Sequence, residues 1–298
     1  MRLMLRTTLA LLAMSGLSLL AGCGDDEPVS SARYAPVDEL YEAMASAVMA
    51  APSLSRMTDI DHSRLAGELG VSMTADHVLL VSEPALEAEM VAANPLLAIE
   101  LPLRALAYET ADGKAAVTYN EWAYIESRYQ LDGDAELGQR YAQAMDSLLT
   151  AVPAESIVRF ADNNMAENGI ISLQSDYDFE TSIERVRAAI NAQDDTVWFG
   201  EIDYQAVAAD QGLSVLPARL LLFGGPGPGG KAMAEAPTLG LDAFCQKLLV
   251  WEDQDGVVRI SFNDLLALAD RQGVKVNPAL RLINFRLNRE FEGAARAD

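Results

Sequence analysis

The feature that most constrains the fold is an internal repeat. Residues 90–121 align with residues 233–264 at a constant offset of 143 and without a gap. The eight identical pairs are Met90/Met233, Ala93/Ala236, Leu96/Leu239, Leu106/Leu249, Glu109/Glu252, Asp112/Asp255, Gly113/Gly256 and Asn120/Asn263. Composition alone would give about two identical pairs over this length. An earlier block agrees at an offset of 142 and includes Ile60/Ile202, Asp61/Asp203 and Gly70/Gly212. A period of this length indicates two copies of one domain and not a solenoid of short repeats.

The repeat divides the chain into six expected segments. These are a lipoprotein signal peptide (1–22), a tether (23–33), a first repeat domain (34–150, copy one), a linker (151–169), a second repeat domain (170–293, copy two) and a tail (294–298). With 50% hydrophobic residues in the chain, each copy is long enough to bury a core of its own.

The amino-terminal segment predicts export and lipidation. Arg2 and Arg6 precede an apolar run that is too short to span a bilayer comfortably. It ends in Leu-Ala-Gly-Cys23, which resembles the lipobox of bacterial lipoproteins, whose cysteine thiol carries a diacylglyceryl group. By resemblance to the enterobacterial sorting rule, Gly24 favours the outer membrane. We therefore expect a protein anchored in the bacterial cell envelope through Cys23, facing the periplasm.

Charge and cysteine content exclude other classes. The chain carries 22 basic and 44 acidic residues, and Arg2 and Arg6 leave with the leader, so the mature net charge is −24. Strong acidity repels polyphosphate, so we expect no nucleic-acid partner. Cys245 is the only other cysteine, and with Cys23 lipidated we expect no internal disulfide.

Both copies show the same order of local signals. In each, an Asp and a Gly bracket a short helix, Asp-Gly marks a hairpin turn, and an Asn is expected to cap the next helix. The corresponding pairs are Asp61/Asp203, Gly70/Gly212, Asp112-Gly113/Asp255-Gly256 and Asn120/Asn263. The sequence thus predicts an α+β protein with two copies of a β-α-β-β-β-β-α type domain, an antiparallel sheet backed by helices.

This order resembles the bacterial domain-of-unknown-function family numbered 302. The resemblance rests on Gly224-Gly225-Pro226 after a strand, Leu101-Pro102-Leu103 before the next strand, and the Asp-Gly turns. It implies a compact fold similar to that of the TATA-box-binding protein. Many family members carry Cys directly after the Leu-Pro, where this chain has Leu103. Copy two has Cys245 without the proline, so we expect a small buried residue there.

The segment Gly225–Lys231 matches the spacing GxxxxGK. Pro226 and Pro228 each remove an amide that a phosphate cradle needs, and Ala232 offers no hydroxyl to a metal ion. We expect a rigid loop, with Lys231 as a weak candidate for a site.

His62 lies beside Asp59 and Asp61, a combination compatible with a metal site or a base with its orienting acid. Copy two has Tyr204 in place of His62, so we expect a structural histidine. No catalytic, cofactor-binding or metal-binding residue is assigned.

The hairpins repeat a basic, an aliphatic and an aromatic residue on one strand face: Arg104, Leu106 and Tyr108, then Lys247, Leu249 and Trp251. One interpretation is a core strand whose first residue, Arg104 or Lys247, emerges into solvent. The other is a groove wall for an anionic or amphipathic ligand.

These observations favour a non-enzymatic binding or envelope protein, whose small-molecule or protein ligand the sequence does not define. The alternative is a thiol- or metal-linked protein or enzyme that uses Cys245 or the Gly-Pro segment.

Overall fold

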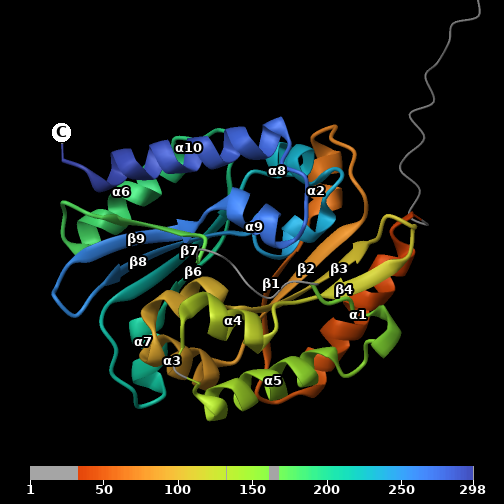
Figure 1. Ribbon diagram of the computed structural model, residues 1–298, viewed down its shortest axis with the longest axis horizontal. Coiled ribbons are helices and arrows are strands. Elements are labelled where there is room, and N and C mark those ends of the chain that lie inside the picture. Colours follow the sequence, from red (N-terminus) through yellow and green to blue (C-terminus); the bar gives the residue numbers. More distant parts are fainter. Residues whose placement is uncertain (1–32, 132, 161–167, 298) are drawn as a thin grey trace, which may run out of the picture.

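The computed structural model describes residues 33–131, 133–160 and 168–297. Its strands form two antiparallel sheets, one in each copy (Figure 1). The strands of copy one are β1 (Ser55–Asp61), β2 (Asp76–Ser82), β3 (Leu103–Glu109) and β4 (Ala115–Thr118). Those of copy two are β5 (Ile170–Gln174), β6 (Val197–Asp203), β7 (Ala218–Gly224), β8 (Gln246–Glu252) and β9 (Val258–Asn263).

The two sheets have the same strand order. The first runs β1-β2-β3-β4, and the second runs β5-β9-β8-β7-β6, in which β6 to β9 are the counterparts of β1 to β4. Both also break register at the same place, between Arg56 and Thr58 in β1 and between Trp198 and Gly200 in β6. The duplicated α+β framework with antiparallel sheets is therefore confirmed, down to a shared bulge.

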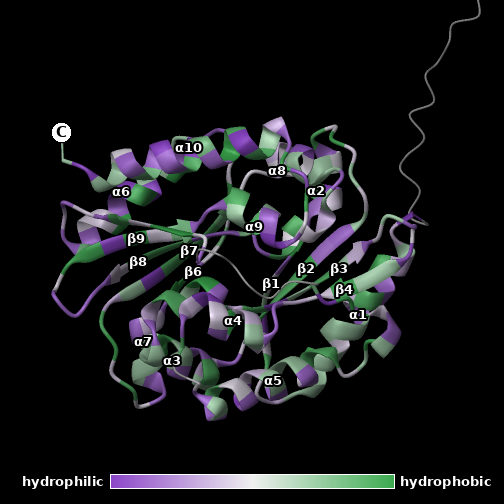
Figure 2. Cartoon of the chain, in the orientation of Figure 1, coloured by the Kyte–Doolittle hydropathy of each residue, from purple (hydrophilic) through white to green (hydrophobic). Residues whose placement is uncertain are grey.

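Helices lie around each sheet, and the outer ones cover one of its faces. Those of copy one are α1 (Ala35–Ala50), α2 (His62–Glu68), α3 (Pro84–Ala93), α4 (Trp122–Tyr129) and α5 (Ala135–Leu149), with the 3₁₀ segment η2 (Pro95–Glu100). Those of copy two are α6 (Phe179–Asn191), α7 (Tyr204–Asp210), α8 (Pro226–Met233), α9 (Leu265–Arg271) and α10 (Pro278–Ala295), with η4 (Pro237–Leu241). A further 3₁₀ turn, η3 (Ala154–Ser156), follows copy one. Helix α1 packs on β2, β3 and β4, while α6 and α10 pack on the second sheet. In Figure 2 these outer helices alternate hydrophilic and hydrophobic residues, as amphipathic helices do.

Local chemistry places these elements where the repeat predicts them. The Asp61 carboxylate accepts the backbone N–H of Arg64 at 2.8 Å and caps α2, and Asp203 caps α7 in the same way. Gly113 and Gly256 have φ angles of 78° and 75°, which allow the tight hairpin turns that side chains would resist.

The expected caps at Asn120 and Asn263 are wrong. The residue after each asparagine is the N-cap, Glu121 for α4 and Asp264 for α9. Both asparagines are instead buried between the copies. Asn and Asp are both good caps, so in copy two the sequence alone does not separate Asn263 from Asp264.

The remaining face of each sheet meets the other copy. Helix α2 packs on α8 and α3 packs on α7, while η4 lies against β2 and β3 and η2 lies against β7, β8 and β9. One continuous hydrophobic cluster includes Leu80 and Leu106 of copy one together with Leu222 and Leu249 of copy two. Burial on both faces explains the unbroken apolar runs at residues 105–108 of β3 and 248–251 of β8.

The two copies differ at one sheet edge. In copy two, β5 pairs with β9, whereas β4 of copy one meets a single bridge between Val117 and Ile157. Residues 1–32, which include the expected leader and Cys23, lie outside the described residues. At the other terminus α10 continues to Ala295, past the expected domain end at residue 293. In the described part of the chain, no helix is both long and apolar enough to cross a bilayer.

Candidate functional site

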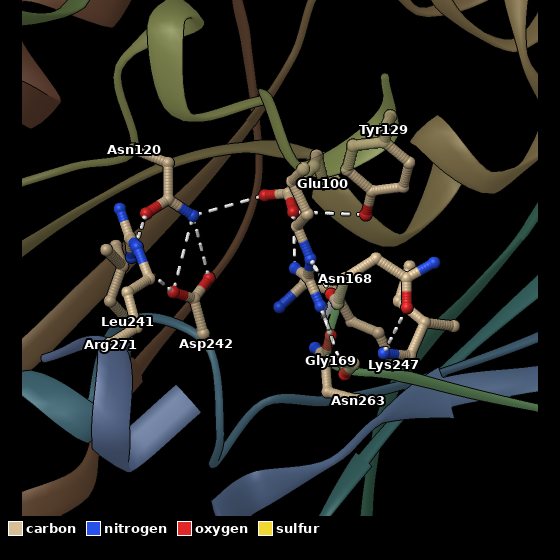
Figure 3. Close-up of polar contacts among 12 residues, drawn as sticks. Glu100, Asn120, Tyr129, Asn168, Gly169, Leu241, Asp242, Lys247, Asn263 and Arg271 are labelled. Atoms are coloured by element: carbon tan, nitrogen blue, oxygen red, sulfur yellow. Dashed lines mark hydrogen bonds and ion pairs between the residues drawn. The ribbon is translucent and has the colours of Figure 1, made fainter. Parts of the chain in front are cut away.

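A group of charged side chains is buried where the two copies meet (Figure 3). Copy one contributes Glu100, Arg104 and Arg128, and copy two contributes Asp242, Lys247 and Arg271. We call these six residues the interface ionic cluster; Asn120 and Asn263 join it through hydrogen bonds. Arg104 is 4% exposed and Lys247 is 2% exposed, so neither emerges into solvent, and the first interpretation of the hairpin face is wrong on this point.

The repeat explains how these side chains come together. Arg104 and Lys247 each lie near the start of the central hairpin strand, β3 or β8. Glu100 ends η2, and Asp242 directly follows η4. Because η4 lies against β3 and η2 against β8, each carboxylate is carried toward the other copy's sheet.

Arg104 links the carboxylates of both copies. Its guanidinium pairs with Glu100 at 3.1 Å and with Asp242, to which Nε also donates at 3.1 Å. The same Nε donates to the Leu241 carbonyl at 2.9 Å. These bonds fix η4 of copy two against β3 of copy one, so Arg104 acts as a tie between the domains.

The other two arginines, Arg128 and Arg271, each bind an asparagine of the opposite copy. Arg128 donates to Glu100 of its own copy at 2.6 Å and to the Asn263 side-chain carbonyl of copy two at 2.6 Å. Arg271 donates to the Asn120 side-chain carbonyl of copy one at 2.9 Å, and it lies 3.8 Å from Asp242. Each arginine therefore orients the asparagine of the opposite copy, an approximate twofold relation.

The charges in the cluster shift the pKa values of its carboxyl groups. Burial raises the pKa of the Asp242 carboxyl, but the charges of Arg104, Arg271 and Lys247 outweigh it and bring that pKa to about 2. Burial opposes ionisation of Glu100 too, and Arg128 and Arg104 again lower its pKa. Both carboxylates are thus ionised at neutral pH, in the form that the arginines require.

Lys247 is the least satisfied member. Its ammonium donates to the Cys245 carbonyl at 3.1 Å and, within the described residues, forms no ion pair. Burial, followed by repulsion from Arg104, lowers its pKa to about 8. Lys247, Asn263 and Asp242 line a cavity of about 10 Å³ whose other walls include Phe223 and Phe262. This volume holds about one water-sized group.

Two further donors of the residues in and around this cluster have no hydrogen-bond partner within residues 33–131, 133–160 and 168–297. They are Asn263 Nδ2 and Arg271 Nε, both buried. Asn120 in copy one is satisfied, because its amide donates to Asp242 at 3.0 Å and to Glu100 at 3.1 Å. The Asn120 amide is therefore fully bonded, whereas Asn263 and Lys247 each keep a donor without a partner in the described residues.

The other residues that the sequence suggested as candidates either lie outside the interface ionic cluster or are unreactive. Cys245 is 1% exposed, and burial raises the pKa of its thiol, which opposes formation of a reactive thiolate. Lys231 is exposed in the last turn of α8. His62 does not face Asp59 or Asp61 and instead contacts Asp76 at 2.6 Å through Nδ1.

We expected a rigid loop in the Gly-Pro segment, but this segment forms the helix α8. Pro226 and Pro228 lie in its first turn, where backbone N–H groups have no intrahelical acceptor. A Cβ on Gly229 would lie 2.9 Å from the Phe244 ring, and one on Gly230 would lie 2.5 Å from Ala66. Gly229 therefore allows close packing within copy two, and Gly230 allows close packing between the copies, which is a structural role and not that of a phosphate cradle.

The repeat held a signal for residues that the sequence reasoning missed. Arg128 and Arg271 are identical at the offset of 143, as are the two asparagines. Glu100 and Asp242 match only at the offset of 142, so the gapless alignment separates them.

Comparison with known proteins gives related chains. The family described as "Domain of unknown function DUF302" matches residues 29–148 and 171–287. Relatives named "Fluoride-specific ion channel FluC 1", from Brucella suis biovar 1 and Brucella abortus biovar 1, are 32% identical over 111 residues, or 37% of this chain. The matched region spans 43% and 40% of their lengths. A crystal structure of an uncharacterized conserved protein of this family from Bacillus stearothermophilus aligns with a TM-score of 0.36 and 16% identity, covering 43% of this chain and 95% of that one.

Proposed function

The chain belongs to the DUF302 family as a tandem of two copies, and we propose that it is a lipid-anchored envelope protein that binds a small anion without catalysing a reaction. The lipobox-like Leu-Ala-Gly-Cys23 supports an anchor at Cys23, and Gly24 supports the outer membrane, facing the periplasm. Anion binding is supported by the unequal charge of the interface ionic cluster.

The charge count is the observation that carries the proposal. Four cationic side chains surround two carboxylates in the interface ionic cluster, all six of them buried. A buried charge without a partner costs several kcal/mol, so a site with excess positive charge favours a bound anion. One of the donors without a partner in the described residues, Asn263 Nδ2, belongs to a residue that lines the small cavity together with Lys247.

The size of the cavity limits the ligand. A space of about 10 Å³ admits a group of the size of water. A halide fits this description, whereas a phosphate would require the surrounding side chains to move. The relatives named for fluoride make fluoride the first anion to test.

Calorimetric titration of the protein without its leader tests the proposal. Sodium fluoride, chloride, acetate and phosphate are compared at constant ionic strength. We expect saturable binding of a small anion that Lys247→Met abolishes and Asn263→Leu weakens. Lys231→Met removes an exposed lysine and should leave binding unchanged. Absence of saturable heat with every anion, or equal binding by the Lys247 variant, would contradict anion binding.

The anchor requires a separate test. In bacteria expressing the full chain, Cys23→Ser should move the protein from the membrane fraction to the soluble periplasmic fraction and remove labelling by radioactive palmitate. Retention of both membrane association and label would show that Cys23 is not the acylated residue.

A further inference from the structure

A second group of ionisable side chains lies in copy one, away from the interface ionic cluster. It comprises Asp38 on α1, Asp61 at the end of β1 and His77 on β2. One potential ligand atom from each residue lies within 4.8 Å of the other two. Three elements thus bring two carboxylates and an imidazole to one place.

The orientation of His77 is set on both sides of its ring. The ring stacks on Tyr41 with centroids 3.7 Å apart and planes inclined by 7°. Its Nε2 lies 2.9 Å from Asp59 Oδ2. Because an ionised carboxylate can only accept, Nε2 carries the proton in this contact. In the neutral imidazole the other nitrogen, Nδ1, then presents a lone pair.

That lone pair points at a second carboxylate. Nδ1 of His77 lies 4.0 Å from Asp61 Oδ2, and it has no hydrogen-bond partner in the described part of the chain. His77 is only 8% exposed, so water cannot freely satisfy this atom. Two electron-rich atoms facing each other at this distance favour a cation between them. A histidine held by a carboxylate through its other nitrogen is the usual arrangement of a metal ligand.

Asp61 divides its oxygens between two roles. Oδ1 accepts the Arg64 backbone N–H and the Ser63 hydroxyl at 2.8 and 2.7 Å, which caps α2. Oδ2 is the atom that faces His77. A cation on Oδ2 would therefore leave the helix cap intact.

Copy two shows what fills the same place when histidine is absent. At the offset of 142, His77 corresponds to Arg219 and Asp61 to Asp203. The Arg219 guanidinium donates to Asp203 at 2.7 Å and to Glu201, the counterpart of Asp59, at 3.0 Å. A permanent cation from the strand thus neutralises the acids of copy two, and copy one has an imidazole in its place.

Arg64 is the competing cation in copy one. It pairs with Asp38 at 2.8 Å and with Asp61, but its side chain is 42% exposed and can turn into solvent. Its counterpart in copy two is Ala206. Three carboxylates here face only two guanidinium groups; the five residues are Asp38, Asp59, Asp61, Arg56 and Arg64. Exchange of Arg64 for a divalent ion would balance these charges.

We propose that copy one binds a divalent transition-metal ion such as Zn²⁺ through His77 Nδ1, Asp61 Oδ2 and an Asp38 oxygen, with water completing the shell. Asp59 is the positioning residue that holds the imidazole. The site is independent of the anion site proposed above. An imidazole ligand favours Zn²⁺ over Mg²⁺, Ca²⁺ and Mn²⁺, which are better suited to oxygen ligands.

The test is calorimetric titration, at pH 7.5 and without an affinity tag, of the protein that lacks its leader with ZnCl₂, MnCl₂, MgCl₂ and CaCl₂. We expect one saturable Zn²⁺ site. Two variants transplant the residues of copy two: His77→Arg should abolish binding, and Arg64→Ala should tighten it several-fold. Asp59→Asn should weaken binding by about 10–100-fold.

His62→Gln is the matched control, because it removes the only other histidine and should leave the affinity unchanged. Circular dichroism checks that each variant folds, and the gain expected from Arg64→Ala cannot arise from misfolding. The proposal is overturned if neither the parent protein nor Arg64→Ala binds Zn²⁺ saturably, or if His77→Arg binds as well as the parent.

Discussion

Copy one closes its half of the interface with ion pairs, whereas copy two leaves part of its half unpaired. Arg104 contacts two carboxylates, but Lys247 at the matching position contacts a backbone carbonyl. Asn120 uses both ends of its amide, but Asn263 uses only its carbonyl within the described residues. Duplication thus preserved the backbone while the side chains diverged, and the divergence marks the places where binding sites can arise.

Matched substitutions of the two basic residues, Arg104 on β3 and Lys247 on β8, should give the largest difference in unfolding free energy. Arg104→Met leaves Glu100 and Asp242 buried with less compensation, and we expect a loss of about 3–5 kcal/mol in unfolding free energy. Lys247→Met removes an unpaired buried charge, so its effect near pH 7 should lie within about 1 kcal/mol of zero or be stabilising. Equilibrium unfolding in urea measures both, and similar losses would contradict the asymmetry.

The pH dependence of Lys247 sharpens the same comparison. Its pKa is lowered from 10.5 to about 8 in the folded protein, so the unfolded chain binds more protons between these values. Stability of the parent protein should therefore rise as pH increases from 8 toward 10.5, with a smaller rise in Lys247→Met. Parallel stability curves for the two proteins would show that the lysine is not strained by burial.

The next largest effect on stability is expected at an acid that only copy one contributes to the interface. Burial raises the pKa of Glu87 on α3 from 4.5 to about 7, and the matching part of α8 consists of glycines. The folded state thus favours the protonated acid, and its contribution to stability is lost as pH rises through 7. Glu87→Gln should gain about 3 kcal/mol relative to the parent between pH 4.5 and 8. A pH-independent difference in urea unfolding would contradict this assignment.

The glycines of α8 should give a smaller effect on stability. Gly230→Ala places a methyl group 2.5 Å from Ala66 and should cost about 1–3 kcal/mol. Gly293→Ala, where a Cβ meets nothing within 4 Å, should be neutral or stabilise α10 by up to about 1 kcal/mol. Thermal unfolding of the pair compares helix propensity with close packing, and equal shifts would show that α8 can move away from α2.

The strands, hairpin turns and Asp caps could be predicted because each rests on local chemistry that the repeat displays twice. The interface ionic cluster could not, because Glu100 and Asp242 align only after a shift of one residue and act across the copies. The helix α8 was missed because Gly and Pro usually indicate loops, whereas here the prolines occupy its first turn and the glycines allow close contact. The grouping of His77 with Asp38 and Asp61 could not be predicted, because these acids lie on other elements, α1 and β1.

A double-mutant cycle between Arg104→Met and Asp242→Asn tests most directly whether charges shared by the two copies hold them together. The residues belong to different copies and are in contact. We predict a coupling free energy of at least about 1.5 kcal/mol in urea unfolding. Additive effects, to within about 0.5 kcal/mol, would contradict a shared ionic interface.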